Sequence, residues 1–328
     1  DPFASGLDTM ALHAALAQLW STHPRTMTAL STHDTKRSED VRARLSVLSE
    51  LPERWRDAAR SWMDRTAQLD PDGLVDARTR YQLLQNLVGA HPIDADRLGE
   101  HALKAAREAK EATSWMRPDP AYEEALAALV RTVCDDELLC AEVTSLVEED
   151  LDPPGRRTEV AQKVLQLMAP GVADLYWGSE DRLHRLVDPD NRVPPGLQQL
   201  RGNLAAVRDA EVDPDGTQAK LAAVSRVVAL RARHASCCVH GGYEPLEVAG
   251  PDMDRVAAFG RGDHLAVVVT RWPGRGPMAA GTTVDLPAGT WRVRLGGCST
   301  SDGSHGGGAA EVAELLGGWS AAVLERDR

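Results

Sequence analysis

Apolar residues recur every three to four positions from residue 38 to residue 168. In a helix this spacing places them on one face, so the pattern predicts a long series of amphipathic helices. The residues that carry these stripes are Val41, Leu45 and Leu48; Trp55, Trp62 and Leu69; Tyr81, Leu84 and Val88; Leu98, Ala102 and Ala109; Tyr122, Leu126 and Leu129; Leu139, Val143 and Leu146; and Val160, Val164 and Leu167. Clusters of Pro, Gly and Asp separate the stripes, and Pro52 is expected to end the first helix. We therefore expect an all-helical block that is much larger than an ordinary connection between two strands.

Two short runs with the composition of strands flank this helical block. Residues 26–31 follow a helical pattern over residues 7–20 and are partly apolar, which predicts a buried strand. Residues 169–180 form the second strand-like run. Two more helices are expected after it, over residues 197–207 and 221–228, because apolar residues return there to helical spacing.

The period of the pattern changes to two near Ala235, which predicts strands in place of helices. The β-rich or alternating segments are residues 264–272, 283–286, 291–295 and 321–324. Turn-forming residues lie at 260–263 and 301–308. Short strands separated by turns favour a small antiparallel sheet domain at the end of the chain.

Charge and length narrow the classes of function. The chain has 37 basic and 49 acidic residues, which gives a formal net charge of −12. This excess repels nucleic acids and anionic membranes, so we expect neither as a partner and favour a neutral or cationic ligand. With 328 residues the chain can bury a sizeable core in roughly two domains. No window is apolar enough to span a bilayer and the first residues do not resemble a signal peptide, so we expect a cytoplasmic protein.

The sequence contains no recognisable pattern for a metal or a cofactor. The five cysteines are an odd number, and neither their spacing nor that of the histidines matches a zinc site. The glycine-rich segment at residues 274–279 contains Pro277 and lies among strand-like runs, so no helix is expected to receive a phosphate there. We therefore expect reduced cysteines and neither a metal nor a cofactor.

Candidate chemistry is concentrated in the stretch Ser-Thr-His-Asp-Thr-Lys-Arg at residues 31–37. His33 and Asp34 follow the expected strand and precede a helix, and (β/α)8 barrels place their catalytic residues at this end of a strand. The stretch resembles the fourth signature block of the α-amylase superfamily, glycoside hydrolase family 13, in which a His-Asp pair after the seventh barrel strand grips a glucose ring. The longer string 31–42 is similar to one family within it, the malto-oligosyltrehalose synthases.

Two later segments extend the resemblance. Residues 169–180 resemble the eighth barrel strand of the same superfamily, and residues 186–192, Leu-Val-Asp-Pro-Asp-Asn-Arg, resemble a segment typical of these synthases. Trp177 departs from the pattern because the superfamily usually has Gln there, and residues 193–195 read Val-Pro-Pro where Arg-Pro-Val is usual. The order and sizes of the segments agree with the resemblance, which covers nearly the whole chain.

The fold implied by the resemblance is mainly α, with a C-terminal antiparallel β domain and a remnant of a (β/α)8 barrel that carries a large helical insertion. The remnant consists of the last two barrel strands. The implied parts are residues 1–37, the end of the barrel with its seventh strand; residues 38–168, the helical insertion; residues 169–234, the eighth strand, a loop and closing helices; and residues 235–328, the sheet domain. No convincing strands for barrel positions one to six are present. We therefore expect either a preceding segment outside this chain or a truncated product.

The resemblance also implies roles for individual residues. Asp34 would stabilise the transition state by hydrogen bonding to hydroxyls of the distorted sugar, and His33 would hold the same ring. The nucleophile and the acid/base, which retaining glycosidases need about 5–5.5 Å apart, would lie outside the chain. Substrate-binding roles are implied for Lys36, Arg37, Tyr176, Glu180, Asp188, Asp190, Asn191 and Arg192.

Each of these candidates also has a structural interpretation. Asp34 or Thr35 could cap the helix that follows, for which Ser38 is another suitable residue. Glu180 could lie in a solvated loop, and the Asp and Asn residues of 186–192 could form turns by bonding their own backbone. The tryptophans that fall on apolar stripes, and are therefore expected in a core, are Trp20, Trp55, Trp62 and Trp115.

For the complete enzyme the resemblance implies an intramolecular transglucosylation in trehalose biosynthesis. The reaction converts the reducing-end α-1,4 linkage of a malto-oligosaccharide to an α,α-1,1 linkage. The implied partners are the malto-oligosaccharide and the missing N-terminal barrel segment, and this chain alone is expected to be inactive because the nucleophile is absent. Two alternatives stay open: an α-amylase-type hydrolase, and a non-catalytic carbohydrate-binding or interaction protein.

Overall fold

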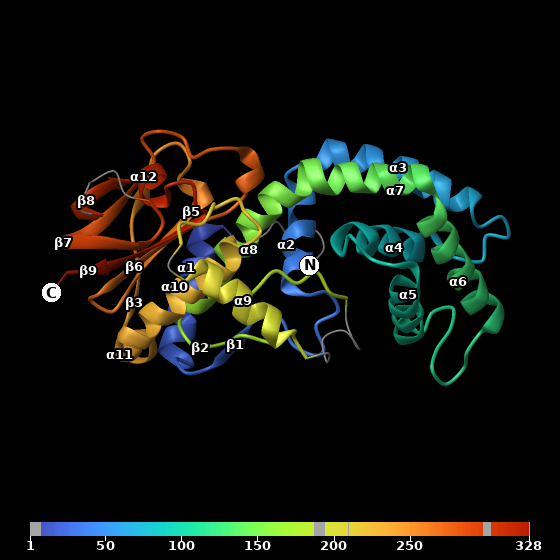
Figure 1. Cartoon of the computed structure of the whole chain (residues 1–328), viewed down its shortest axis with the longest axis horizontal. Helices are drawn as coiled ribbons and strands as arrows, with labels where there is room; N and C mark the ends of the chain where they lie inside the picture. The colour runs from blue at the N-terminus through green and yellow to red at the C-terminus, as the bar shows by residue number, and fades with distance from the viewer. Residues whose placement is uncertain (1–7, 187–193, 209, 298–302, 328) are drawn as a thin grey trace. The chain divides into compact units, whose positions relative to one another are not determined.

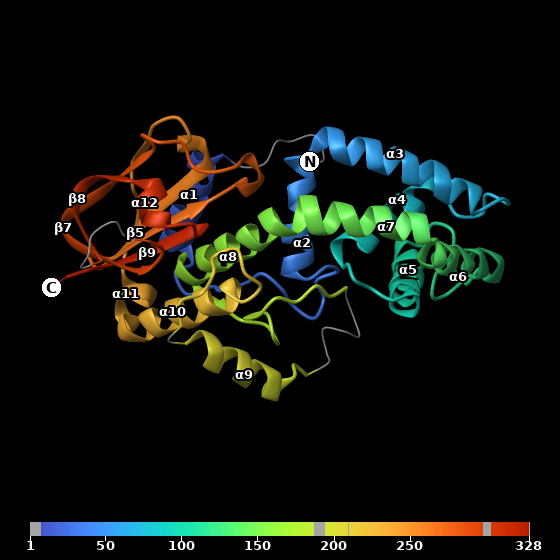
Figure 2. The same cartoon turned by 45° about the horizontal axis from the view of Figure 1, so that its top comes forward.

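The computed structural model describes residues 8–186, 194–208, 210–297 and 303–327. The chain divides into two compact units (Figures 1 and 2). The helical unit contains His33–Gly155 and Leu183–Val193, and the sheet unit contains Asp1–Thr32, Arg156–Arg182 and Pro194–Arg328. Each unit buries apolar side chains of its own.

Helices make up the helical unit, as the apolar stripes predict. They are α2 (Glu39–Ser46), the 3₁₀ turn η1 (Val47–Ser49), α3 (Pro52–Gln68), α4 (Ala77–Gly89), α5 (Ala95–Ala109), α6 (Pro120–Asp135), α7 (Glu137–Ser145), the π-helical turn η2 (Leu146–Leu151) and the start of α8 (Asp152–Met168). The residues that cap α4 to α7 by accepting hydrogen bonds from the first turn are Asp76, Asp94, Asp119 and Asp136. The expected break at Pro52 is present, because α2 and η1 end before it and Pro52 begins α3, where proline loses no helical hydrogen bond.

The apolar stripes form the core of the helical unit. Val41, Leu84 and Leu98 are fully buried, and Leu126 is 1% exposed. Burying one such aliphatic side chain stabilises a fold by about 1.5–3 kcal/mol relative to leaving it in water. Tertiary burial of these stripes therefore holds helices that would be marginal in isolation.

The four tryptophans expected in a core differ in burial. Trp62 is 2% exposed, and its Nε1 donates a hydrogen bond to Glu142 at 2.7 Å. Trp20 and Trp55 are partly buried. Trp115 is 57% exposed, so the expectation that it lies in the core is wrong. It lies in the loop between α5 and α6, where its ring is contacted by the Arg107 guanidinium at 4.7 Å.

The sheet unit contains a pair of short parallel strands, β1 (Met27–Ala29) and β2 (Val172–Asp174). Met27 pairs with Val172, so the two strand-like runs that flank the helical block are neighbours, as expected. The expectation that the first strand is buried is wrong, because Met27 is 72% exposed and Val172 is 44% exposed. In the described part of the chain no further strand pairs with either of them.

The rest of the sheet unit is an antiparallel sheet with helices. Its helices are α1 (Thr9–Thr22), the end of α8, α9 (Leu197–Val207), α10 (Ala219–Arg233), α11 (Ala235–His240) and α12 (Val312–Leu316). Its strands are β3 (Tyr243–Pro245), β4 (Val248–Ala249), β5 (Val256–Arg261), β6 (Leu265–Thr270), β7 (Thr283–Leu295), β8 (Ser304–Glu311) and β9 (Ala321–Arg326). The strand order is β3-β5-β6-β9-β7-β4, and β8 pairs with β7 (Figure 1).

Two local expectations for this region are wrong. The chain does not turn to strands at Ala235; it forms α11, which buries Cys238. Glycine-rich residues expected to turn form β8, which pairs with β7. One of them lies too close to the neighbouring backbone for a side chain, since a Cβ on Gly307 would lie 2.6 Å from Ala288 Cα. The segments 283–286 and 291–295 belong to one strand, β7, whose pairing with β8 is irregular between them. The expected antiparallel sheet domain is nevertheless present.

Alternate residues of the central strands enter two apolar clusters, as the period of two requires. Phe259 and Val267 belong to the cluster that includes buried residues of α10. Ala258 and Val268 belong to the cluster that includes α12 and Trp291 of β7. Among the described residues, no helix combines the length and apolarity that a bilayer crossing requires.

Candidate functional site

His33 and Asp34 lie in the turn between β1 and α2, where the sequence pattern places them. His33 Nε2 lies 3.2 Å from Asp34 Oδ2, and the two side chains are 59% and 83% exposed. Both are therefore accessible to a ligand. The structural interpretation of Asp34 or Thr35 as the cap of α2 is wrong, because Ser38 caps this helix by accepting from the Val41 N–H.

Hydrogen bonds join the start of α2 to residues 183–186, about 145 positions later in the chain. Ser38 Oγ donates to the Leu183 carbonyl at 2.6 Å, and the Ser38 N–H donates to the Arg185 carbonyl at 2.9 Å. The carboxylate of Asp40 accepts from the Leu183 N–H at 2.6 Å, and Asp40 is fully buried. The helical unit thus brings residues 183–186, which lead into the second distinctive block, next to the first.

Leu186 is the last described residue of this second block. It is buried, forms an antiparallel bridge with Arg37, and accepts a hydrogen bond at its carbonyl from Arg97 Nη2 at 3.2 Å. The candidates that follow it lie outside the described residues: Asp188, Asp190, Asn191 and Arg192. Their implied roles in substrate binding stay predictions.

Lys36 and Arg37 have different surroundings. Lys36 Nζ forms an ion pair with Glu108 at 2.6 Å. Arg37 Nε donates to the Asn86 amide oxygen at 2.8 Å, and Nη2 donates to the Gln85 amide oxygen at 3.2 Å. Burial lowers the pKa of Arg37 from its ordinary value. Neutral amides thus orient the Arg37 guanidinium without neutralising its charge.

An open hollow of about 500 Å³ lies beside these two residues in the helical unit. Its size falls within the roughly 300–1,000 Å³ of small-molecule sites. It is lined by Thr35, Lys36, Arg37, Arg42, Arg78, Tyr81, Gln82 and Gln85. The last four residues belong to α4, and sequence reasoning missed them as site residues. Their spacing of three, one and three positions places them on one face of a helix, and this pattern could have identified them as a shared surface.

The expectation that Tyr81 belongs to an apolar stripe is only partly right. Leu84 and Val88, which share the predicted stripe, are fully buried, whereas Tyr81 is 37% exposed. The Tyr81 hydroxyl accepts a hydrogen bond from Trp55 Nε1 at 3.0 Å. The side chain therefore lies at the edge of the core and lines the hollow.

A buried histidine lies near the same block. His101 on α5 is 4% exposed, and in the described part of the chain its Nδ1 has no hydrogen-bond partner. Burial, and then the charges of Arg97, Arg37, Lys36 and Lys104, lower the pKa of His101 to about 4. The imidazole is therefore neutral near pH 7, and the positive charges around it come from lysine and arginine.

Tyr176 and Glu180 belong to the sheet unit, whereas the other described candidates belong to the helical unit. The Tyr176 carbonyl accepts a hydrogen bond from the Ser179 N–H at 2.8 Å. Gly178, which lies in this turn, has a φ of 80°. Glu180 is partly exposed in the same turn region. Asp181, in contrast, accepts from Asn203 Nδ2 at 2.9 Å and has a structural role. The substrate-binding roles of Tyr176 and Glu180 stay predictions.

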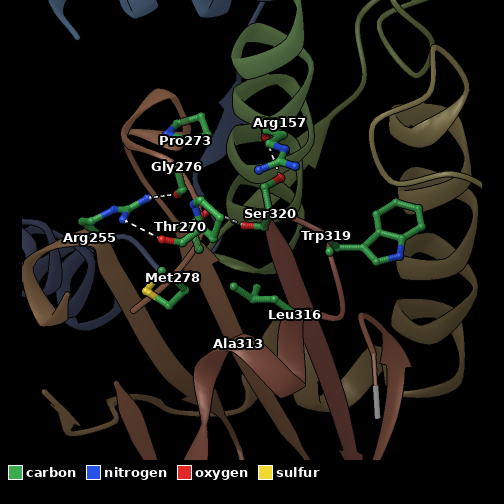
Figure 3. A pocket seen from close by; sticks show the side chains of 12 residues that line it. Arg157, Arg255, Thr270, Pro273, Gly276, Met278, Ala313, Leu316, Trp319 and Ser320 are labelled. Carbon is green, nitrogen blue, oxygen red and sulfur yellow. Dashed lines mark hydrogen bonds between the residues drawn. The ribbon is translucent and has the colours of Figure 1, made fainter. Parts of the chain in front are cut away.

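A second hollow, of about 300 Å³, lies in the sheet unit (Figure 3). Arg255 at its edge is 5% exposed and donates to the Gly276 carbonyl at 2.7 Å and the Pro277 carbonyl at 3.3 Å. Thr270 Oγ1 donates to the Ser320 carbonyl at 2.9 Å, and Ser320 Oγ donates to the Arg157 carbonyl at 2.6 Å. The polar groups of this hollow therefore bond chiefly to the protein's own backbone.

The described residues contain no cluster of three or more His, Cys, Asp or Glu side chains that could hold a metal ion. Four cysteines, Cys134, Cys140, Cys237 and Cys238, are free thiols. Burial raises the pKa of Cys134 to about 11, so this thiol is a poor nucleophile near pH 7. Among the described groups, the exposed His33–Asp34 pair and the hollow beside it are the best candidate site.

Comparisons with known proteins show which proteins this chain is similar to. No family model matches the chain. A protein of Mycobacterium tuberculosis named as a maltooligosyl trehalose synthase is 36% identical over 339 residues, and the match covers 100% of this chain and 41% of that protein. The same values apply to the protein from a second strain. The chain thus spans about two fifths of the length of the curated relatives it matches.

Solved structures give the same result. The structure of maltooligosyltrehalose synthase from Arthrobacter ramosus is 35% identical with a TM-score of 0.86, covering 100% of this chain and 42% of that chain. A maltooligosyl trehalose synthase structure from Sulfolobus tokodaii is 25% identical with a TM-score of 0.76, covering 99% of this chain and 42% of that one. The resemblance expected from the sequence is confirmed: over its whole length the chain is similar to the C-terminal portion of these synthases.

Proposed function

We propose that this chain is the C-terminal portion of a malto-oligosyltrehalose synthase and contributes part of the active site of that enzyme. The observation that carries the proposal is the hydrogen bonding of Ser38 and Asp40 to residues 183–186. It joins the exposed His33–Asp34 pair to the segment that leads into Asp188. Two blocks that separately resemble these synthases thus belong to one compact unit.

The rest of the enzyme would complete the sheet that β1 and β2 begin. Parallel strands occur almost only in sheets covered on both faces, yet Met27 and Val172 are largely exposed. A further segment with the remaining strands of a (β/α)8 barrel would cover them. The same segment would supply the nucleophile and the acid/base, which must flank the scissile bond at about 5–5.5 Å from each other.

In the proposed reaction, Asp34 accepts hydrogen bonds from ring hydroxyls of the sugar that becomes covalently attached to the nucleophile. These bonds strengthen as the ring flattens towards an oxocarbenium ion, so Asp34 acts mainly in the transition state. His33, 3.2 Å from the Asp34 carboxylate, helps to orient it and contacts the same ring. The released glucose stays bound, turns, and attacks through its anomeric hydroxyl, which gives the α,α-1,1 linkage.

This outcome requires the bound glucose to react before water does. Holding a reactant in place can provide effective molarities of about 10⁵–10⁸ M, far above the concentration of water. Exclusion of water also prevents hydrolysis of the covalent intermediate. We propose that the helices of the helical unit and the loops around Asp34 and Asp188 provide this enclosure.

The test is product analysis with the full-length protein and maltopentaose. A non-reducing product with a terminal trehalose unit is expected, whereas glucose and shorter reducing chains would identify an amylase-type hydrolase instead. This 328-residue chain alone is the control and should form neither product, since the nucleophile is absent. Failure of the full-length protein to act on maltopentaose would overturn the enzyme assignment.

Asp34→Asn in the full-length protein tests the role of the site. Removing the charge weakens charge-assisted hydrogen bonds worth about 1.5–3 kcal/mol each, so two such bonds predict a loss of about 10²–10⁴-fold in kcat. KM should change far less, because the bonds act in the transition state. Asp64→Asn, on an exposed residue of α3, is the matched control and should leave kcat unchanged. A kcat for Asp34→Asn within threefold of wild type would remove His33 and Asp34 from the sugar site.

A further inference from the structure

Helix α4 presents one polar face to the hollow beside Lys36 and Arg37. Arg78, Tyr81 and Gln82 follow one another at helical spacing on this face, and Gln85 continues it. The opposite face is anchored by residues such as Leu84, which is fully buried. The polar face is therefore held rigidly by the core behind it.

Tyr81 provides a fixed aromatic surface in this hollow. Its hydroxyl accepts from Trp55 Nε1 at 3.0 Å, and the two rings lie with centroids 6.0 Å apart. Trp55 in turn packs edge-on against buried Trp62 at 6.1 Å. With its hydroxyl and one side occupied, the remaining exposed ring surface of Tyr81 lines the hollow.

Unused hydrogen-bonding groups surround this ring. Gln82 is exposed, and within the described residues its amide has no hydrogen-bond partner. The amide oxygen of Gln85 accepts from Arg37 Nη2. This contact fixes the orientation of the Gln85 amide. Arg37 Nε and Nη2 are occupied by neutral amides, so its Nη1 can donate to a ligand. An aromatic face with amide and guanidinium groups around it matches a ring that has C–H faces and hydroxyl edges.

Two of the four cations that line the hollow are held in ion pairs. Lys36 is paired with Glu108 at 2.6 Å, and Arg78 is paired with Glu111 at 2.5 Å. The other two cations are Arg37, whose Nε and Nη2 bond neutral amides, and Arg42, which lies near Glu39 and Asp40. An anion bound by Lys36 or Arg78 would have to compete with their carboxylate partners. A neutral polyol can instead bond to the amides and to Arg37 without breaking either ion pair.

We propose that the α4 face is a glucosyl-binding subsite for the malto-oligosaccharide chain, with Tyr81 stacking on one sugar ring and Gln82 and Arg37 bonding its hydroxyls. This inference rests on the proposed function. The subsite binds a sugar remote from the bond that breaks, so it contributes equally to the ground state and the transition state. Its loss therefore raises KM and leaves kcat nearly unchanged.

The test measures kcat and KM of the full-length protein for a series of malto-oligosaccharides. Tyr81→Ala should raise KM by about 3- to 10-fold for chains long enough to reach α4, which is the range of an aromatic contact. Gln82→Ala should raise it by about 2- to 10-fold, as for one hydrogen bond. Tyr81→Phe keeps the ring and should stay within about twofold of wild type. Gln82 is exposed, so Gln82→Ala should fold normally and can test the subsite even if Tyr81→Ala folds poorly.

The outcomes separate this inference from the proposed function. A wild-type protein that forms no trehalose-terminated product would overturn the function itself. An active wild type whose KM is unchanged in both Tyr81→Ala and Gln82→Ala would overturn only the subsite. Competitive inhibition by inorganic phosphate that disappears in Gln82→Ala would also overturn it, since the hollow would then be an anion site.

Discussion

The two hollows differ in how their polar groups are used. Beside α4, Arg37 is oriented by neutral amides and the Gln82 amide has no hydrogen-bond partner among the described residues, so donors and acceptors stay available. In the sheet unit, Arg255 bonds to backbone carbonyls and Asp252, and Ser320 bonds to the Arg157 carbonyl (Figure 3). Similar residue types thus build a binding surface in one place and a loop scaffold in the other.

This difference shows why a hollow and a nearby arginine do not by themselves indicate a ligand site. Arg255 Nη1 and Nη2 bond to carbonyls of the loop around Gly276, whereas its buried Nε has no hydrogen-bond partner among the described residues. That loop includes Trp272, which has φ of 56° and lies between two arginines, Arg271 at 3.8 Å and Arg275 at 4.1 Å from its ring centroid. Arg255 therefore stabilises an unfavourable backbone conformation.

Arg255→Met is expected to have the largest effect on stability. It breaks the ion pair with Asp252, 3.1 Å away, and removes the donor that bonds to the partly buried Gly276 carbonyl and to the Pro277 carbonyl. Losing one partner of a buried pair costs about 3–5 kcal/mol, which should appear as a lower unfolding free energy of the full-length protein in urea. Activity measured well below the unfolding temperature should remain near wild type.

Arg275→Met is the matched control for this change. Arg275 is exposed and contacts only the Trp272 ring among the described interactions, so its loss should cost less than about 1 kcal/mol. An Arg255→Met protein that is as stable as wild type but has altered kinetics would reverse the comparison. The hollow in the sheet unit would then be a functional site.

The unfolding free energy should depend on pH through His101, whose pKa is lowered by burial and by charges that include Arg37 and Lys36 beside the first hollow. His101 has a pKa of about 4 in the folded protein and an ordinary value of 6.5, so the unfolded chain takes up the proton first as the pH falls. The contribution of neutral His101 to the unfolding free energy is complete above pH 6.5 and is lost towards pH 4. At 1.36 kcal/mol per pH unit it amounts to up to about 3 kcal/mol. Urea unfolding at a series of pH values between 7 and 4 would measure it.

His101→Leu should remove this component of the pH dependence. Arg255→Met should retain it, because an arginine does not titrate in this range. His240→Leu, at an exposed position of α11, is the matched histidine control and should also retain it. Equal slopes for wild type and His101→Leu would contradict a neutral, buried His101.

Asp76→Ala should have the smallest effect, on both stability and binding. Asp76 caps α4 by accepting from the Arg78 N–H at 2.9 Å and the Thr79 N–H at 3.0 Å. Losing such a cap costs about 1 kcal/mol. Fraying of the first turn should displace Arg78 and raise KM by less than Tyr81→Ala does. Asp72→Ala, at an exposed position before the helix, is the control, and an equal loss there would show that the cap has no special role.

Much of the helical unit could be predicted from local pattern. Ser38 was predictable as the cap of α2, and Leu84 and Val88 as core, because a helix face is defined by residues within a few positions of each other. The position of His33 and Asp34 between a strand and a helix followed from the same local reading. The implied roles of both residues came from resemblance to a family and not from the pattern.

The remaining features depend on contacts between distant parts of the chain. The exposure of Trp115 and Met27 follows from what other segments cover, and the strand β8 forms only because β7 lies beside its glycines. The partners of Arg37 on α4 lie about 48 positions away, and no local pattern indicates them.

The sequence by itself thus determined the helices of the helical unit, the Ser38 cap of α2, the existence of a C-terminal sheet and the location of the His33–Asp34 pair. Only the tertiary structure decided that Tyr81 lines a hollow, that Arg37 keeps Nη1 available and that both Nη groups of Arg255 bond to loop carbonyls. The physical reason is that periodicity and capping act within a few residues, whereas burial and the satisfaction of hydrogen bonds depend on which distant segment arrives as the neighbour.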